Sequence, residues 1–134
     1  MTGFPLKIVT PDGVSFDGTA EQLVVRTTSG DVAIMARHVN YVAPLGMGQA
    51  VVTVEGEKRY AACIGGMVSV VEGVVTLVPT TFEWSGDIDV ARAEASKKRA
   101  EETLEKQDAT DLEISLAEAR LKRSLIRTNV AKYK

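Results

Sequence analysis

Arginine side chains recur at helical spacing in two stretches near the C-terminal end of this 134-residue chain. The first stretch holds Asp89, Arg92, Ser96 and Arg99, and the second holds Arg120, Arg123 and Arg127. Steps of three and four residues place each set on one face of a helix. Guanidinium groups bind phosphate in bidentate fashion, and two facing rows of arginine would repel each other unless an anion lay between them. The spacing predicts either a nucleotide polyphosphate site or a solvated surface whose arginines pair with carboxylates.

Other groups that could do chemistry are scarce. His38 is the only histidine and Cys63 the only cysteine, so neither a paired metal site nor an internal disulfide is expected. Cys63 lies in an apolar run, which favours a buried, inert thiol. The glycines of 46–48 and 65–66 match no phosphate-binding loop and are typical of tight turns or bulges. We therefore expect no enzyme activity and no metal.

The arginines require helices to position them, and the pattern after residue 86 is helical. Carboxylates at Asp87 and Asp89 are suited to a helix start, and the first helix is expected over 88–106. A turn at 107–110 leads to a second helix, capped by Thr110 or Asp111 and running to about 130. The expected apolar positions are Ile88, Val90, Ala91, Ala93, Ala95, Ala100 and Leu104, and then Leu112, Ile114, Leu116, Ala117, Ala119, Leu121, Leu125, Ile126 and Val130. Residues 87–134 are thus predicted to form an antiparallel helical hairpin, thin enough to act as a mobile element.

The preceding residues, 1–86, have the pattern of an all-β domain. Short runs rich in Val, Thr and Ile are broken by turn signals about every 10 residues, the spacing of a sandwich or barrel. Turns are expected at 11–13 and 17–18, and β-hairpins around 55–58 and 72–73.

Charge is distributed unevenly along the chain. The net charge is −2, yet six basic residues and no acidic one follow position 118. Such a basic helical end can meet an acidic protein surface, nucleic acid or a polyanionic ligand. No apolar run reaches membrane-spanning length, and the first residues lack the features of a signal peptide, so an intracellular setting is the default expectation.

Several short motifs, spread over nearly the whole chain, resemble the epsilon subunit of bacterial rotary F-type ATP synthases. They are Val9-Thr10-Pro11-Asp12-Gly13, Ser29-Gly30-Asp31, Val42-Ala43-Pro44-Leu45, Gly65-Gly66, Val74-Val75-Thr76-Leu77 and Ile88-Asp89-Val90-Ala91-Arg92-Ala93. The chain departs from the usual family pattern at Ala33, Ala36-Arg37 and Asn40, all within one loop region.

The resemblance implies a ten-stranded antiparallel β sandwich followed by the helical hairpin. It implies a non-catalytic central-stalk subunit that requires no cofactor and binds the gamma subunit and the c-ring. Such a subunit couples proton-driven, or sodium-driven, rotation to ATP synthesis at the cytoplasmic side of the cell membrane, as a peripheral part of the complex. The hairpin can also extend toward acidic segments of the alpha and beta catalytic subunits and inhibit ATP hydrolysis.

The resemblance further implies that ATP binds the folded hairpin as a regulatory ligand. The residues that match the family's ATP site are Glu83, Ile88, Asp89, Arg92, Ala93, Arg99, Arg123 and Arg127. Two alternatives remain: the same subunit with a hairpin insensitive to nucleotide, and a free module whose basic helices bind nucleic acid. The acidic overall charge and the single tryptophan, Trp84, disfavour nucleic acid.

Overall fold

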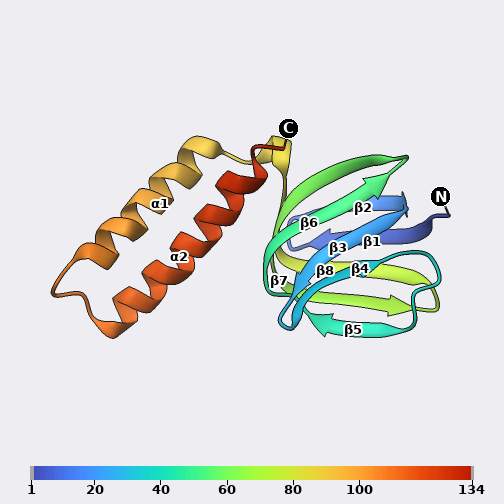
Figure 1. Cartoon of the computed structure of the whole chain (residues 1–134), viewed down its shortest axis with the longest axis horizontal. Coiled ribbons are helices and arrows are strands. Elements are labelled where there is room, and N and C mark those ends of the chain that lie inside the picture. The colour runs from blue at the N-terminus through green and yellow to red at the C-terminus, as the bar shows by residue number, and fades with distance from the viewer. Residues whose placement is uncertain (1, 134) are drawn as a thin grey trace. The chain divides into compact units, whose positions relative to one another are not determined.

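The computed structural model describes residues 2–133 and divides into two compact units, Met1–Trp84 and Ser85–Lys134 (Figure 1). The first unit contains the strands β1 (Phe4–Thr10), β2 (Gly13–Ala20), β3 (Gln22–Thr27), β4 (Gly30–Ile34), β5 (Tyr41–Pro44), β6 (Met47–Val54), β7 (Glu57–Val71) and β8 (Val74–Trp84). The second contains a 3-10 turn, η1 (Ser85–Asp87), and the helices α1 (Val90–Glu105) and α2 (Asp111–Val130). The predicted fold class, a β sandwich followed by a two-helix hairpin, is confirmed.

The sandwich is one hydrogen-bonded sheet in the order β2-β1-β8-β7-β6-β3-β4, with β5 added to β7. Inward side chains of β1, β3, β6, β7 and β8 meet in a single core, so the sheet folds over on itself. Alternation along each strand produces this core, because successive side chains point to opposite faces. In β1, for example, Leu6 and Ile8 are buried while Pro5 and Lys7 are exposed.

The described residues form eight strands rather than the predicted ten, because two of them run unusually long. β7 pairs with β6 through its first half and with β5 through its second half, and the two halves meet at Gly65 and Gly66. Gly66 has a φ of 99°, and a Cβ there would lie 2.0 Å from the carbonyl oxygen of Val78. Only glycine allows the two backbones to approach so closely, so the strand bends there without ending.

Two further expectations about the sandwich were wrong. No turn forms at Asp17 and Gly18, since β2 continues through them opposite Lys7 and Leu6 of β1. One strand pair is also parallel rather than antiparallel: Leu6–Ile8 of β1 lies beside β8. A parallel pair needs a long connection, and here the connection is the whole chain from β2 to β7.

The loop after β4 contains Ala36, Arg37 and Asn40, which depart from the family pattern, whereas the fourth departure, Ala33, lies within β4 opposite Val24. Arg37 has a φ of 66°, a left-handed conformation that glycine adopts more readily. The backbone N–H of His38 donates to the carbonyl of Met35 at 3.3 Å and closes this turn. The Asn40 side-chain oxygen accepts from the backbone N–H of Glu72 at 2.8 Å, which ties the loop to the β7–β8 turn.

The helical unit begins and ends its helices with side-chain caps. Asp89 is the N-cap of α1, where its carboxylate accepts from the backbone N–H of Arg92 at 3.0 Å. Thr110 and Glu113 form a reciprocal capping box at the start of α2. The two helices run antiparallel, side by side (Figure 1). Both caps confirm the sequence-based expectation.

Candidate functional site

The two helices meet along a seam of small side chains. The buried residues of α1 are Ala93 and Ala100, which lie seven residues apart. In α2, the buried residues Ala117, Ser124 and Thr128, at steps of seven and four residues, share one face; we call these five residues the seam. The Ser124 hydroxyl donates to the Arg120 carbonyl at 2.8 Å, so its polar group is satisfied within its own helix. The alanine-rich stripe expected for α1 is therefore confirmed in part, because small residues allow close approach.

Other expected apolar positions do not lie in the seam. Ala91 and Ala95 of α1 are exposed, as is Val90. In α2, Leu112 and Leu116 are 69% and 61% exposed. The predicted apolar positions were thus wrong at Val90, Ala91, Ala95, Leu112 and Leu116, because the helices pack along a line that does not include them.

The arginines occupy a fixed position relative to the seam. Arg92 and Arg99 directly precede the seam residues Ala93 and Ala100, and successive residues in a helix are rotated by about 100°. On α2, Arg123 and Arg127 directly precede Ser124 and Thr128, and Arg120 precedes the half-buried Leu121.

Equivalent positions on two antiparallel helices lie on the same side of the pair. A twofold axis perpendicular to the plane that contains both helix axes exchanges the two helices. Rotation about this axis leaves each residue on the same face of the pair. All five arginines, Arg92, Arg99, Arg120, Arg123 and Arg127, consequently line one side of the helical hairpin, which we call the arginine side.

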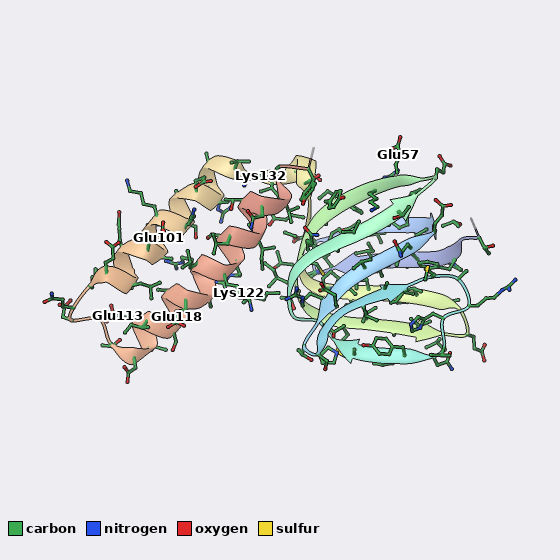
Figure 2. All side chains as sticks on the ribbon, in the orientation of Figure 1. Glu57, Glu101, Glu113, Glu118, Lys122 and Lys132 are labelled. Atoms are coloured by element: carbon green, nitrogen blue, oxygen red, sulfur yellow. The ribbon has the colours of Figure 1, made fainter. Side chains whose placement is uncertain are left out.

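Carboxylates gather on the opposite side. Glu94, Glu101 and Glu118 each directly follow a seam residue, so the same rotation directs them away from the arginines. Figure 2 labels Glu101 on α1 and Glu118 on α2. Two acidic residues do lie toward the arginine side, Asp89 and Glu113, and both are engaged as helix caps. The helical hairpin is therefore segregated into an arginine side and a carboxylate side.

This segregation leaves four of the arginines without counterions. Within residues 2–133, the guanidinium groups of Arg92, Arg99, Arg120 and Arg123 form no ion pair and no side-chain hydrogen bond. Arg26 in the sandwich provides the contrast, since it bonds Asp31 and thereby lowers the pKa of that carboxyl group. The expected alternative, arginines neutralised by carboxylates of their own helix, is not what the structure has. Clustered cations of this kind favour a polyanionic ligand.

Helix lengths place the arginines in register across the seam. Arg92 lies 13 residues before the end of α1 and Arg123 lies 12 residues after the start of α2. At a rise of about 1.5 Å per residue, both are roughly 18–20 Å from the turn between the helices. Asp89 lies 16 residues before the end of α1 and Arg127 lies 16 residues after the start of α2, so these two residues are also level with each other.

The structure brings seven of the eight predicted ATP-site residues into the helical unit. Ile88 is buried, Asp89 caps α1, and Ala93 belongs to the seam. Glu83 is the exception: it lies in β8 of the sandwich, opposite Ala62 of β7, and its part in the site stays a prediction. Arg120 is an addition that the family motif did not include, although its spacing from Arg123 and Arg127 already pointed to it.

The sandwich supplies no competing site of this kind. His38 hydrogen-bonds through Nδ1 with its neighbour's carbonyl at 2.8 Å, and burial raises the pKa of the Cys63 thiol to about 12. Among residues 2–133, no cluster of three or more His, Cys, Asp or Glu side chains could hold a metal ion. Neither described helix has the length and apolarity needed to cross a membrane.

The outer face of the sandwich over β5, the second half of β7 and β8 carries several exposed apolar side chains. Its exposed large side chains are Val42, Met67, Val71, Val74 and Val78. They are neighbours across the sheet, since Met67 pairs with Val78 and Val71 with Val74. The polar pair Ser69 and Thr76 lies between these two apolar pairs. A surface that gathers exposed apolar side chains in this way is typical of a protein–protein contact.

Comparison with known proteins assigns both units. Residues 3–85 match the model of the ATP synthase delta/epsilon chain β-sandwich domain, and residues 87–132 match that of its long α-helix domain. The ATP synthase epsilon chain of Ruminococcus albus is 44% identical over the whole of both chains. That of Bacillus licheniformis is 40% identical over 98% of this chain and all of the relative.

Solved structures share the fold at lower identity. A chain in the Euglena gracilis mitochondrial ATP synthase (OSCP, F1 and c-ring) has a TM-score of 0.83 and 20% identity, covering all of this chain and 83% of the other. A chain of the Tetrahymena thermophila central stalk and c-ring has a TM-score of 0.61 and 16% identity, covering 95% of each. By its two matched domains and its full-length relatives, this chain belongs to the ATP synthase epsilon chain family, a family of non-catalytic subunits.

Proposed function

We propose that this chain is the epsilon subunit of a rotary ATP synthase's central stalk and that its helical hairpin binds ATP as a regulatory ligand. The observation that carries the ATP proposal is the arginine side. Four of its guanidinium groups have no ion pair, and the acidic residues nearest to them are engaged as helix caps. A triphosphate supplies the missing negative charge through charge-assisted hydrogen bonds.

Each predicted residue has a definite task in this arrangement. Arg92 and Arg123, at one level of the hairpin, would grip phosphate oxygens from both helices, with Arg99 nearer the turn. Asp89 orders the first turn of α1 and so fixes the backbone that carries Arg92. Ile88 and Ala93, one buried before the helix and one in its seam, would border the base.

The sandwich would hold the subunit in the stalk. Its exposed apolar side chains Val42, Met67, Val71, Val74 and Val78 suit burial against a protein partner, and the gamma subunit and c-ring are the partners proposed. The two structural relatives support that placement, since one belongs to an assembly of OSCP, F1 and c-ring and the other to a central stalk and c-ring. The subunit would thus couple ion-driven rotation to ATP synthesis as a peripheral component at the cytoplasmic face of the cell membrane.

Regulation would come from the helical hairpin. The last part of α2 and the residues after it are basic, with Lys122 in the helix and Lys132 just beyond its end, both labelled in Figure 2, as are the acidic Glu113 and Glu118 that precede them. Once extended, this basic part could bind acidic segments of the catalytic alpha and beta subunits and inhibit ATP hydrolysis. ATP that binds only the folded hairpin would oppose the extension, by the linkage between ligand binding and conformation.

Calorimetric titration of the full chain with ATP tests the site. We expect saturable binding by the native sequence and a loss of at least about 100-fold in affinity in the variant Arg92→Ala/Arg123→Ala, because two charged hydrogen-bonding groups are removed. The matched control is Lys98→Ala/Lys122→Ala, which also removes one exposed cation from each helix but neither on the arginine side. Its ATP affinity should change by less than about twofold at physiological salt.

Two results would contradict the proposal. If the native chain does not bind ATP at cellular concentrations, the helical hairpin is insensitive to nucleotide and the arginines are a solvated surface. If the lysine control loses as much affinity as the arginine variant, binding follows net charge rather than a site. Far-UV circular dichroism of each variant checks that α1 and α2 remain folded.

A further inference from the structure

Arg120 lies in the same row as the arginines of the proposed ATP site, yet it is outside the set that the family motif supplies. It stands one helical step from Arg123, and its side chain is exposed and free of ion pairs. Its backbone carbonyl accepts the Ser124 hydroxyl, so its main chain is held in the helix while its guanidinium group is available.

The position of Arg120 along the hairpin fills a gap in that row. Arg120 lies nine residues after the start of α2, and Ser96 lies nine residues before the end of α1, so the two are level, at about 14 Å from the turn. Arg99 follows one turn closer to the tip on α1. The arginine side therefore continues past Arg92 and Arg123 toward the tip, with Arg120 as its next cation on α2.

No nearby carboxylate competes for this guanidinium group. Glu118 follows the seam residue Ala117 and is turned to the other side of the pair. Glu113 accepts hydrogen bonds from the backbone and hydroxyl of Thr110 in the capping box. A bound polyanion would meet Arg120 without first having to displace an ion pair.

We propose that Arg120 is a further phosphate-binding residue of the helical hairpin and that it increases the preference for ATP over ADP. This inference rests on the proposed ATP site. Each additional phosphate brings further negative charge and reach, so a cation beyond Arg92 and Arg123 in the row interacts more strongly with the longer triphosphate. Arg92 and Arg123 would bind both nucleotides, and Arg120 would distinguish between them.

The test compares Arg120→Ala with Lys122→Ala in the full chain, each titrated with ATP and with ADP by calorimetry. Both substitutions remove one exposed cation from the same turn of α2 and introduce the best helix former, but only Arg120 lies on the arginine side. We expect Arg120→Ala to weaken ATP about tenfold and ADP at most about threefold, which lowers the ATP-to-ADP ratio. Lys122→Ala should change both affinities by less than about twofold.

A ratio in Arg120→Ala equal to that of Lys122→Ala would overturn the inference and leave the ATP site intact. Failure of the proposed function has a different signature, because the native chain itself would then bind neither nucleotide. Arg120→Gln, which keeps side-chain length and helix propensity, serves as a second variant if circular dichroism finds Arg120→Ala altered. It should lower the same ratio.

Discussion

The two units differ most in what they bury. The sandwich core contains large aliphatic side chains that are fully enclosed, such as Leu6, Ile8, Leu23 and Leu77. The helical seam encloses alanine methyl groups and hydroxyls. Burial of a large aliphatic side chain contributes about 1.5–3 kcal/mol and a single methyl group about 0.8 kcal/mol, so the seam holds its helices far more weakly than the core holds its strands.

This difference indicates where regulation can act. A ligand present at 100 times its dissociation constant stabilises the state it binds by about 2.7 kcal/mol. That free energy is small compared with the stabilisation from burial in the sandwich core, but it is comparable to the stabilisation from burial of the small seam residues. If the proposed ATP site is correct, an anion bound by the arginine side would help decide whether the helical hairpin stays folded, while the fold of the sandwich would be little affected.

The largest expected effect comes from creating a cavity in the sandwich core. Leu77→Ala removes a fully buried side chain in β8 and should lower the free energy of unfolding of the sandwich by about 2–5 kcal/mol, because a cavity remains. The neighbouring Val78→Ala, at a 47% exposed position, is the control and should cost less than about 1 kcal/mol. Urea unfolding followed by Trp84 fluorescence measures both, since Trp84 packs edge-on against Phe82. Equal losses would mean that the core is not the principal support of this unit.

A smaller effect is expected from overfilling the helical seam. Ala100→Leu inserts a branched side chain where the helices approach closely and should destabilise the hairpin by about 1–3 kcal/mol. Ala95→Leu, at an exposed position of the same helix, is the matched control and should be nearly neutral. Amide hydrogen exchange would locate the loss in α1 and α2 with strands β1–β8 unchanged. Exchange that accelerates equally in the strands would remove the distinction between the two units.

The smallest predicted effect is a gain in the sandwich. Arg37→Gly should raise its free energy of unfolding by about 0.5–1 kcal/mol, because glycine adopts the φ of 66° without strain. The gain is reduced by the greater freedom of glycine in the unfolded chain. Arg37→Ala separates the side chain from the backbone: it removes the charge, keeps the strain and should give no gain. Matching urea midpoints for the two variants would show that the left-handed turn is not a source of strain.

Local chemistry made several features readable from the sequence. Asp89 and Thr110 identify helix starts because their short side chains can accept from the unpaired backbone N–H groups of the first helical turn. Spacing of three and four residues places the arginines of each helix on one face. Alternation of apolar and polar residues defines strands such as β1, since the period of side-chain direction is fixed by the backbone.

Only the tertiary structure decided the features that depend on distant residues. The packing of α1 against α2 selected Ala93 and Ala100 for the seam and left Ala91 and Ala95 in solvent, although all four residues are alike in chemistry. That choice set the five arginines on one side and the seam-following carboxylates on the other. The sequence by itself determined which residues each helix carries on each face. Which face packs against the other helix was decided by contacts across the hairpin, because close packing depends on the shapes of both surfaces.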